Sequence, residues 1–523
     1  MSDGTVERAP QITFRQYMTV AFLPLILAVV FTFPWRILDT TIREMEPYYQ
    51  LQNPEGVNAK NSILLDYTTS YFITTPFKSI YRRHYYVFSS ALISIAVLII
   101  APLSSEALFV SLSGDCGINK SGPCHATWGI YPTLARAMEA ILAFISLLVL
   151  AMMILNSRRH SGVYANPLSI AGLGTLFQNP ATLGEFSSIN SRVGDDGLKA
   201  ILAQRKYNLS SMKDSSETSY YGIINISAKE DIDSLSTFGG DVRGKYSVVN
   251  STEELRTSSG FRIKNSSKGR NDRWAWMLET LLHSSAFLLI AGLLALVTYY
   301  HWTSGDTGFE RFMDSQEFGV KFLMTVVGVI IKLFWANIDE DLRRTEPYRR
   351  LLEGSAKPED SILVYTYMSP ISALASSLVR RHYLTSLISF VALLSEILPI
   401  ALANIPFSPA ATREAYSVCT YIAMAVLAIM ILTLVLFVIF RHTRARHLHH
   451  LPRQPVTIAS TLVYLATETR DHRGSMIESL AGLVFVGAKE RDTMVRAMGR
   501  RYGMGRIGEA DLRIDDEDRI SRY

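Results

Sequence analysis

The chain has 523 residues, of which 48% are hydrophobic and only 19% are charged, and its formal net charge at pH 7 is +5. Soluble domains usually carry about 25% charged residues, so this composition argues against a soluble protein and indicates a membrane protein with polar segments between its spans. A net charge this small gives no basic footprint for nucleic acid, and we expect no nucleic-acid partner.

Seven apolar runs are long enough to cross a bilayer, since a spanning helix needs about 20 mostly apolar residues. None of them has a continuous polar face, and Trp and Tyr stand near several of their ends, as interfacial anchors do. The sequence therefore predicts an all-α integral membrane protein with about seven transmembrane helices. The expected spans are 17–35, 86–104, 134–155, 276–300, 318–336, 384–403 and 417–440.

The region that follows the first span recurs after the fifth. Trp35–Leu51 and Trp335–Leu351 are identical at seven of 17 positions. Two shorter matches follow, which pair Ser62-Ile63-Leu64 with Ser361-Ile362-Leu363 and Arg82-Arg83-His84-Tyr85 with Arg380-Arg381-His382-Tyr383. Such self-similarity indicates a duplicated unit. We predict two parallel membrane repeats, at 17–155 and 318–440, and an adaptor span at 276–300 that restores the orientation of the second.

Lys and Arg are concentrated in the loops 36–85 and 337–383, whereas loops 105–133, 301–317 and 404–416 have one basic residue each. The positive-inside rule then places both repeated motifs in the cytoplasm. We expect the 156–275 segment and the 441–523 tail there as well, and residues 1–16 outside. The plasma membrane and the internal membranes are not distinguished.

A short outside loop carries two further features. Cys116 and Cys124 bracket it, and we expect a disulfide between them because the outside compartment is oxidising. Asn119 between them begins a glycosylation sequon. Four other sequons, at Asn208, Asn225, Asn250 and Asn265, fall in the expected cytoplasmic segment and disagree with this topology. We base the predicted topology on the asymmetry of Lys and Arg and not on these four sequons, because chance matches are common in a segment rich in Ser and Asn.

The two polar segments have similar patterns. Residues 165–207 have a helix-like apolar rhythm, whereas 208–272 is mostly Ser, Thr, Asn, Gly and charge, and we expect it to be disordered apart from a short strand at 219–227. In the tail, Pro455–Leu465 resembles Pro167–Leu176, and a helix-like stretch follows near 476–502.

The repeated motif places charged residues on one face of each helix end, because they are spaced by four and three positions. The candidate functional residues of this motif are Asp39, Arg43, Glu46, Tyr48, Asp339, Arg343, Glu346 and Tyr348. One interpretation is a packed helix end, closed by the Pro of each copy. The functional alternatives are a docking surface for a partner or a latch between the two halves.

The segments Ser62–Tyr81 and Ser361–Leu378 are too polar to span, and we expect each to lie on the cytoplasmic leaflet or to dip into it. Basic residues follow each segment, and the candidates for lipid contact are Arg82, Arg83, His84, Arg380, Arg381 and His382. They are either simple topological anchors or sites that recruit anionic lipid headgroups.

Charged residues inside spans are rare and point to function. Glu396 lies well inside the sixth span, and Lys321 lies near the outer end of the fifth. A Glu396–Lys321 pair is conceivable, with Lys332 reaching to the inner interface. These residues are either part of an ion or proton pathway or paired structural groups.

Trp-x3-Asp-x3-Arg-x2-Glu-Pro-Tyr, followed by Ser-Ile-Leu-Leu-Asp-Tyr and Arg-Arg-His-Tyr, resembles a family of fungal multi-pass membrane proteins that carry a repeated domain of unknown function, including the spray-type proteins. The tail motif Ala497–Gly505 is similar as well. The resemblance implies a fungal origin but no reaction, ligand or site residue. The second copy departs from the first where Arg349-Arg350 replace Tyr49-Gln50.

The sequence contains no Walker loop, nucleophile elbow, zinc-protease motif or dinucleotide-binding fingerprint. We therefore expect no enzyme and no cofactor. The first functional hypothesis is a scaffold or organiser that acts through its cytoplasmic juxtamembrane motifs, with the bilayer and unknown proteins as partners. The alternative is a channel, transporter or lipid-moving protein with a path between the two repeats.

Overall fold

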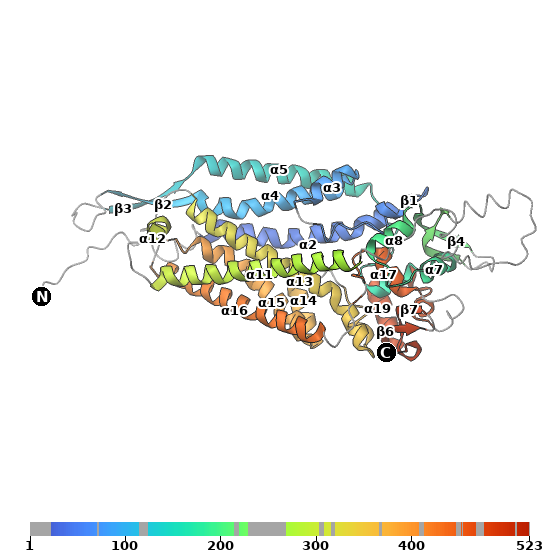
Figure 1. Cartoon of the computed structure of the whole chain (residues 1–523). Coiled ribbons are helices and arrows are strands. Elements are labelled where there is room, and N and C mark those ends of the chain that lie inside the picture. Colours follow the sequence, from blue (N-terminus) through green and yellow to red (C-terminus); the bar gives the residue numbers. More distant parts are fainter. Residues whose placement is uncertain are drawn as a thin grey trace, which may run out of the picture.

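The structure is a computed structural model of the whole chain (Figure 1). It describes residues 22–70, 73–114, 124–213, 219–227, 268–302, 308–314, 319–365, 369–406, 413–445, 451, 453–466, 475–507 and 510–521. Figure 1 shows long helices side by side, with most of the short helices and strands gathered at one end of the bundle.

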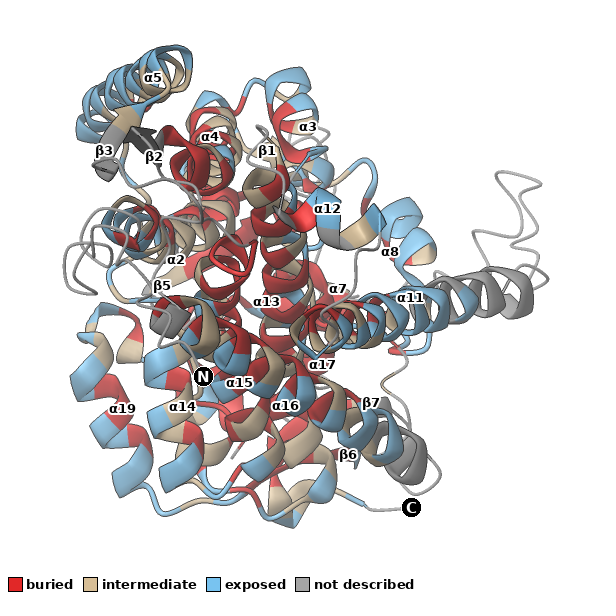
Figure 2. Cartoon of the chain, turned by 90° about the vertical axis from the view of Figure 1, so that its left-hand side faces the viewer, coloured by how far each residue is buried: buried red, intermediate tan, exposed pale blue. Residues whose placement is uncertain are grey.

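Seven helices among the described residues are long and apolar enough to cross a membrane, which confirms the predicted number of spans. They are α2 (Leu23–Leu51), α4 (Tyr85–Ala107), α5 (Pro132–Ser157), α11 (Lys268–Trp302), α13 (Val320–Glu353), α15 (Tyr383–Ala403) and α16 (Arg413–Ala445). Figure 2 shows that α13, α15 and α4 are mostly buried at the centre of the bundle, while α5 and α11 expose most of their surface.

The helices α2 and α13 continue well past the predicted spans and carry the repeated motif on their ends. Pro47 and Pro347 lie inside these helices, which corrects the interpretation that the proline of each copy closes its helix. A proline inside a helix removes one hydrogen bond and costs roughly 3 kcal/mol. Here the helices persist because Leu51 and Leu351 beyond the prolines are fully buried in a shared core.

Each repeat is built on an antiparallel helix pair, α2 with α4 and α13 with α15. A short helix precedes the second member of each pair, α3 (Thr75–Tyr81) and α14 (Pro370–Val379), and packs against it. In the second repeat, Gly328 lets the helices approach closely, because a Cβ there would lie 2.8 Å from Pro399 Cα. This contact fixes the register of α13 against α15.

The polar segments of the two halves fold together into one body at the end of the bundle, which we call the polar module. The first half contributes β1 (Val57–Asn58), η2 (Ala59–Asn61), α6 (Ile170–Thr175), α7 (Pro180–Ser187), α8 (Asp195–Leu202), β4 (Lys206–Lys213) and β5 (Ser219–Asn225). The second contributes η3 (Pro358–Asp360), α17 (Ile458–Leu465), α18 (Met476–Ser479), η5 (Leu483–Phe485), α19 (Ala488–Ala497), β6 (Tyr502–Ile507), β7 (Ala510–Asp516) and η6 (Glu517–Arg519). One apolar core joins most of these elements with the ends of α2 and α13.

The strand expected at 219–227 is present as β5, whereas β4 corrects the expectation of disorder at 208–213. They pair antiparallel with Tyr207 opposite Asn225, and β1 extends the sheet on the other edge of β4. The polar composition of 208–213 hid β4, because only a few of its side chains, such as Tyr207 and Leu209, are buried hydrophobic groups. The expectation for 228–267 falls outside the described residues.

The opposite end of the bundle carries the hairpin of β2 (Leu108–Gly114) and β3 (Cys124–Ile130) together with α12 (Gly308–Asp314) (Figure 1). Cys116 and Asn119 lie outside the described residues, and nothing is described of the Cys124 side chain. The predicted disulfide and glycosylation site therefore stay predictions.

Candidate functional site: the clasp between the repeats

The acidic residues of the repeated motif point into the molecule. Glu46 and Asp339 are each only 1% exposed, and Asp39 and Glu346 are also buried. Tyr48 and Tyr348 are buried in the core of the polar module. These side chains are therefore not a docking surface, and their contacts are with the rest of the chain.

The aspartate of each copy ties together the two helices of its own repeat. Ser90 Oγ of α4 donates to Asp39 Oδ1 over 2.6 Å, and Arg43 pairs with the same carboxylate at 2.6 Å. In the second repeat, Ser389 Oγ of α15 donates to Asp339 over 2.6 Å, and Arg343 pairs with it at 2.8 Å. The two arrangements are equivalent, and neither serine was among the residues predicted from the sequence.

The glutamate of each copy has different partners in the two repeats. Glu46 pairs with Arg159 at 2.9 Å, and the Arg159 guanidinium also lies over the Tyr49 ring, 4.3 Å from its centroid. The equivalent residue Glu346 is paired instead with Arg349, Arg350 and His382. The replacement of Tyr49-Gln50 by Arg349-Arg350 thus supplies cations locally where the first repeat draws on Arg159 from the end of α5.

The two repeats meet at equivalent positions. Arg36 Nη2 of α2 donates to the backbone oxygen of Ala336 in α13 over 2.9 Å, and these residues are 300 positions apart. A small cavity beside this contact, of about 30 Å³, is lined by residues of both helices and by Pro370. A contact between equivalent positions lies near an approximate twofold axis that relates the repeats.

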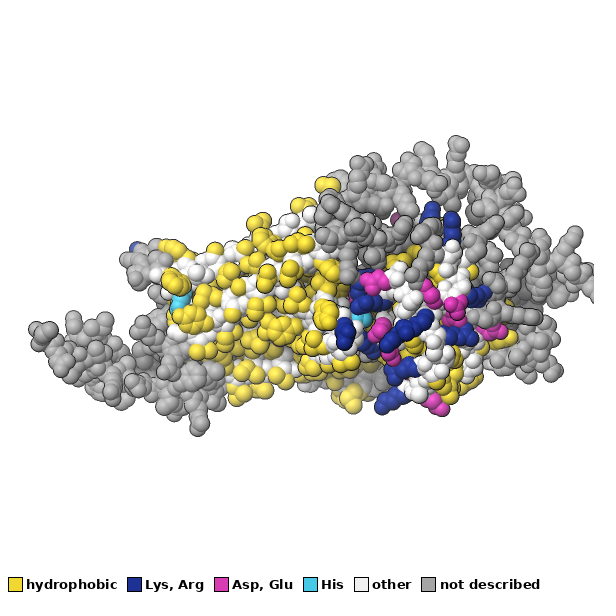
Figure 3. Space-filling model, turned by 90° about the horizontal axis from the view of Figure 1, so that it is seen from below, with side chains coloured by type: hydrophobic (Ala, Val, Ile, Leu, Met, Phe, Trp, Pro, Cys, Tyr) yellow, Lys and Arg dark blue, Asp and Glu magenta, His cyan; other side chains and the backbone are white. Residues whose placement is uncertain are grey.

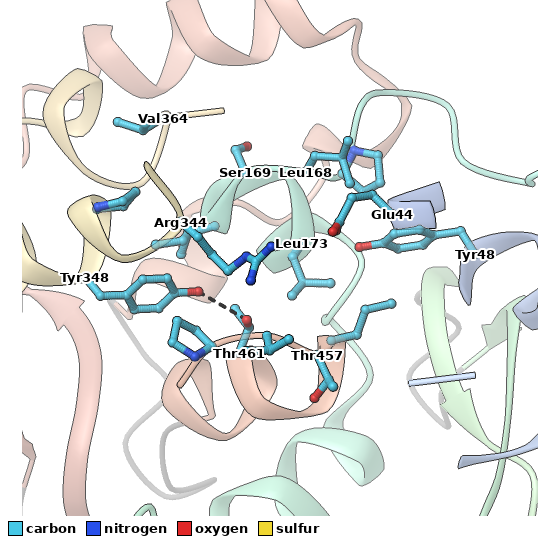
Figure 4. A pocket seen from close by; sticks show the side chains of 16 residues that line it. Glu44, Tyr48, Leu168, Ser169, Leu173, Arg344, Tyr348, Val364, Thr457 and Thr461 are labelled. Carbon is cyan, nitrogen blue, oxygen red and sulfur yellow. Dashed lines mark hydrogen bonds between the residues drawn. The ribbon is translucent and has the colours of Figure 1, made fainter. Parts of the chain in front are cut away.

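A larger cavity of about 80 Å³ lies on the same axis, between the helix ends and the polar module (Figure 4). Most of its lining residues form pairs of equivalent positions, namely Tyr48 with Tyr348, Glu44 with Arg344, Pro167 with Pro455, Ser169 with Thr457, Ile170 with Ile458, and Leu173 with Thr461. Tyr348 and Thr461 hydroxyls are 3.1 Å apart. The cavity has room for roughly five water molecules.

The polar segments cross over between the repeats, and we call this arrangement the clasp. Ala171 N of the first half donates to Ile362 O of the second repeat over 2.9 Å. Ala459 N of the second half donates to Ile63 O of the first repeat, also over 2.9 Å. Arginines add further links, since Arg513 Nη2 donates to the backbone oxygens of Ser187 and Ile189 at 2.9 and 2.8 Å.

Glu396 pairs with Lys332 at 2.5 Å, which corrects the expected pair with Lys321. The register set by Gly328 and Pro399 places Lys332 opposite Glu396, whereas Lys321 lies 11 residues nearer the start of α13, roughly 16 Å away along the helix. Lys321 interacts electrostatically with Glu106, a residue the sequence did not single out. Glu106 also accepts hydrogen bonds from Gly319 N and Phe322 N at the start of α13, at 3.3 and 3.0 Å.

The Arg-Arg-His sequences form the turns from α3 to α4 and from α14 to α15. In each turn the histidine is buried, the first arginine is partly buried and the second is exposed. His84 Nδ1 lies 2.7 Å from the Tyr67 hydroxyl, and burial, together with the positive charges of Arg82 and Arg159, lowers the pKa of His84 to about 4. Burial also lowers the pKa of His382, and Glu346 opposes this shift.

Residues 18–109 and 318–407 each match the model of a family described as Protein of unknown function (DUF3433). The matches cover α2 to α4 and α13 to α15, and they confirm that a domain of unknown function occurs twice in the chain. Comparison with curated proteins and with solved structures gave no match.

Proposed function

We propose that the protein is a non-enzymatic scaffold or organiser of the membrane, which holds a polar module at the cytoplasmic face to bind a protein partner. The clasp carries this proposal, because each polar segment is bound to the opposite repeat. Because each half binds the other, the polar module keeps one orientation relative to the bilayer. The basic loops support the cytoplasmic placement, and the motif resemblance supports an origin among fungal spray-type proteins.

A cluster of exposed aromatic residues on the module is suited to partner binding. Tyr164 and Phe485 are 64% and 57% exposed, and their ring centroids are 4.9 Å apart in an edge-to-face arrangement. Tyr221 packs on both, with centroids 5.6 Å from each. Aromatic side chains dominate the energy of protein interfaces. This aromatic cluster includes residues of both halves, so it exists only in the clasped module.

Cross-linking of the full chain in its native membrane tests this proposal. The variant Tyr164→Ser/Phe485→Ser removes the aromatic cluster, and Ile201→Ser removes an equally apolar exposed residue of α8 as a control. We expect one set of proteins to be cross-linked to the wild-type chain and to the control but to be lost in the cluster variant. An unchanged set in all three chains contradicts a partner site at the cluster.

The second candidate, a transport path along α13, is favoured by one asymmetry. Lys332 and Glu396 occupy the register positions at which the first repeat has Thr32 and Val97. A charged pair inside one repeat only is unexpected for a purely structural duplication. Ion or lipid flux in proteoliposomes tests this candidate. Flux that Glu396→Gln abolishes, and that Glu139→Gln on the exposed face of α5 leaves intact, supports transport, and its absence in folded preparations supports the scaffold.

A further inference from the structure

Both short helices that precede the second span end in the same backbone turn. Arg83 N donates to Ile80 O over 3.0 Å, and His84 N donates to Ser79 O over 2.9 Å. In the second repeat, Arg381 N donates to Leu378 O over 3.1 Å, and His382 N donates to Ser377 O over 2.8 Å. This pair of bonds defines a Schellman motif, which satisfies the last carbonyl groups of a helix.

An arginine occupies the left-handed position of each motif. Arg83 has φ of 61° and Arg381 has φ of 58°. Glycine is the usual residue there, because a side chain with a Cβ is disfavoured at positive φ. Both copies therefore keep an arginine where the backbone alone favours glycine, which indicates that the side chain has a use.

The structure shows that this side chain is the outward one of each basic pair. Arg83 and Arg381 are exposed, whereas their neighbours turn toward the polar module. Arg82 Nη1 lies 3.5 Å from Lys60 O, and Arg380 interacts with Asp360. Of the six described residues that the sequence suggested for lipid contact, Arg83 and Arg381 are the two that are exposed.

Exposed apolar side chains lie on and beside the short helix that each of these arginines follows. Tyr81 is 90% exposed and its counterpart Val379 is 85% exposed. The same positions are exposed in both repeats, namely Ile73, Ile80, Tyr81 and Tyr85 around Arg83, and Ile371, Leu378, Val379 and Tyr383 around Arg381. We call each such group a lipid foot. Large apolar residues this exposed are expected to face lipid in a membrane protein.

Each foot lies at the border between the apolar bundle and the polar module. The Arg-Arg-His turn leads directly into a spanning helix, so its arginine stands at the level where that span begins. Figure 3 shows Lys and Arg side chains gathered where the apolar surface of the bundle ends. At that level a bilayer presents its phosphate groups.

We propose that each lipid foot binds the headgroup phosphate of one anionic phospholipid in the leaflet beside the polar module. The apolar residues lie among the acyl chains, and the guanidinium of Arg83 or Arg381 donates hydrogen bonds to the phosphate oxygens. Guanidinium groups pair with phosphate by parallel hydrogen bonds. The backbone turn holds each arginine outward, so the two sites are built into the repeat. This inference goes beyond the scaffold role and does not depend on a protein partner.

The variant Arg83→Gly/Arg381→Gly provides an unusually clean test, because glycine suits the left-handed backbone. The full chain is reconstituted in nanodiscs of phosphatidylcholine that contain a small fraction of labelled phosphatidylserine, and the enrichment of the label around the protein is measured. Each basic residue near the leaflet is worth about a fivefold change in binding of anionic lipid. We expect the glycine variant to lose enrichment by about this factor per site while its Tm in detergent stays equal or rises.

Two controls complete the test. Arg83→Lys/Arg381→Lys keeps the charge and is expected to retain most of the enrichment. Arg501→Gln/Arg506→Gln removes two exposed arginines of the polar module and is expected to leave it unchanged. Full enrichment in the glycine variant overturns the proposal, and so does an equal loss in the Arg501/Arg506 variant, which means that total charge decides binding. A lower Tm in the glycine variant shows that the arginines are structural, which also overturns it.

Discussion

Arg36 donates a hydrogen bond to the backbone of Ala336, the residue that occupies its own position in the second repeat. A contact between equivalent positions places both residues on the axis that relates the repeats. It also shows how the symmetry is broken, because one repeat supplies a long cation and the other a small residue that leaves its carbonyl accessible. The cavity between Tyr48 and Tyr348 lies on the same axis and is broken in the same way, with Glu44 facing Arg344.

The aspartate of each repeat is predicted to stabilise its helix pair. Ser90→Ala and Ser389→Ala each remove a hydrogen bond to a buried carboxylate and are expected to cost about 1.5–3 kcal/mol. Thermal unfolding in detergent measures the loss. Ser146→Ala on the exposed face of α5 is the control and is expected to have no effect. Similar Tm values for all three variants contradict the assigned role.

The Lys332–Glu396 pair is predicted to be replaceable as a pair but not singly. Lys332→Thr or Glu396→Val alone leaves a buried charge without its partner and is expected to cost about 3–5 kcal/mol. The double variant Lys332→Thr/Glu396→Val installs the residues of the first repeat and is expected to recover most of this loss. A double variant as unstable as the singles shows that the charges are not coupled.

The crossed hydrogen bonds of the clasp are predicted to stabilise the polar module and not the bundle of spanning helices. Ala171→Pro removes the N–H group that bonds Ile362 O, while proline is tolerated in the first turn of a helix. We expect a loss of about 1–2 kcal/mol and faster proteolysis of the polar module. Asp196→Pro places proline at the same position of α8 and is the control. Equal protease sensitivity of the two variants contradicts the crossed contact.

Acid is predicted to weaken the fold through the buried histidines. His84 has a folded pKa of about 4, whereas an unperturbed histidine has a pKa near 6.5. At pH values between 4 and 6.5 only the unfolded chain binds this proton. The contribution of neutral His84 to the free energy of unfolding is therefore complete above pH 6.5 and is lost as the pH falls toward 4. After allowance for solvent screening, the loss is on the order of 1 kcal/mol.

Unfolding of the His84→Asn variant between pH 7 and pH 4 checks this prediction. We expect a shallower fall in Tm than in the wild-type chain, and a further flattening when His382→Asn is added. His160→Asn changes an exposed histidine and is expected to keep the wild-type slope. An identical slope in all variants assigns the acid sensitivity to other groups.

The spans and the repeat were predictable from the sequence because both are read from short stretches of chain. Apolar length alone identifies a span. The continuation of α2 through Pro47 was not predictable, since it depends on burial of Tyr48 and Leu51 against segments more than 100 residues away. For the same reason, composition suggested disorder at 208–213, where β4 pairs with the predicted strand and buries Leu209.

The details of the candidate site depended on register, which the sequence alone does not give. The matches of the two repeats are offset by 298 positions at Arg82 and Arg380 but by 299 at Ser90 and Ser389, so a simple alignment pairs Ser90 with an isoleucine. The partner of Glu396 likewise follows from the close contact of Gly328 with Pro399. Such contacts belong to the packing of helices and not to any single segment.

Disulfide trapping across the clasp tests the central claim most directly. Cysteine pairs are placed at Ala171 with Ile362 and at Ala459 with Ile63 in a chain that lacks its native cysteines and carries a protease site within 228–267. After cleavage, the two halves are expected to remain linked on a non-reducing gel. The uncrossed pairs, Ala171 with Ile63 and Ala459 with Ile362, are expected to leave them separate. Halves that separate with the crossed pairs contradict the clasp and the parallel arrangement of the repeats.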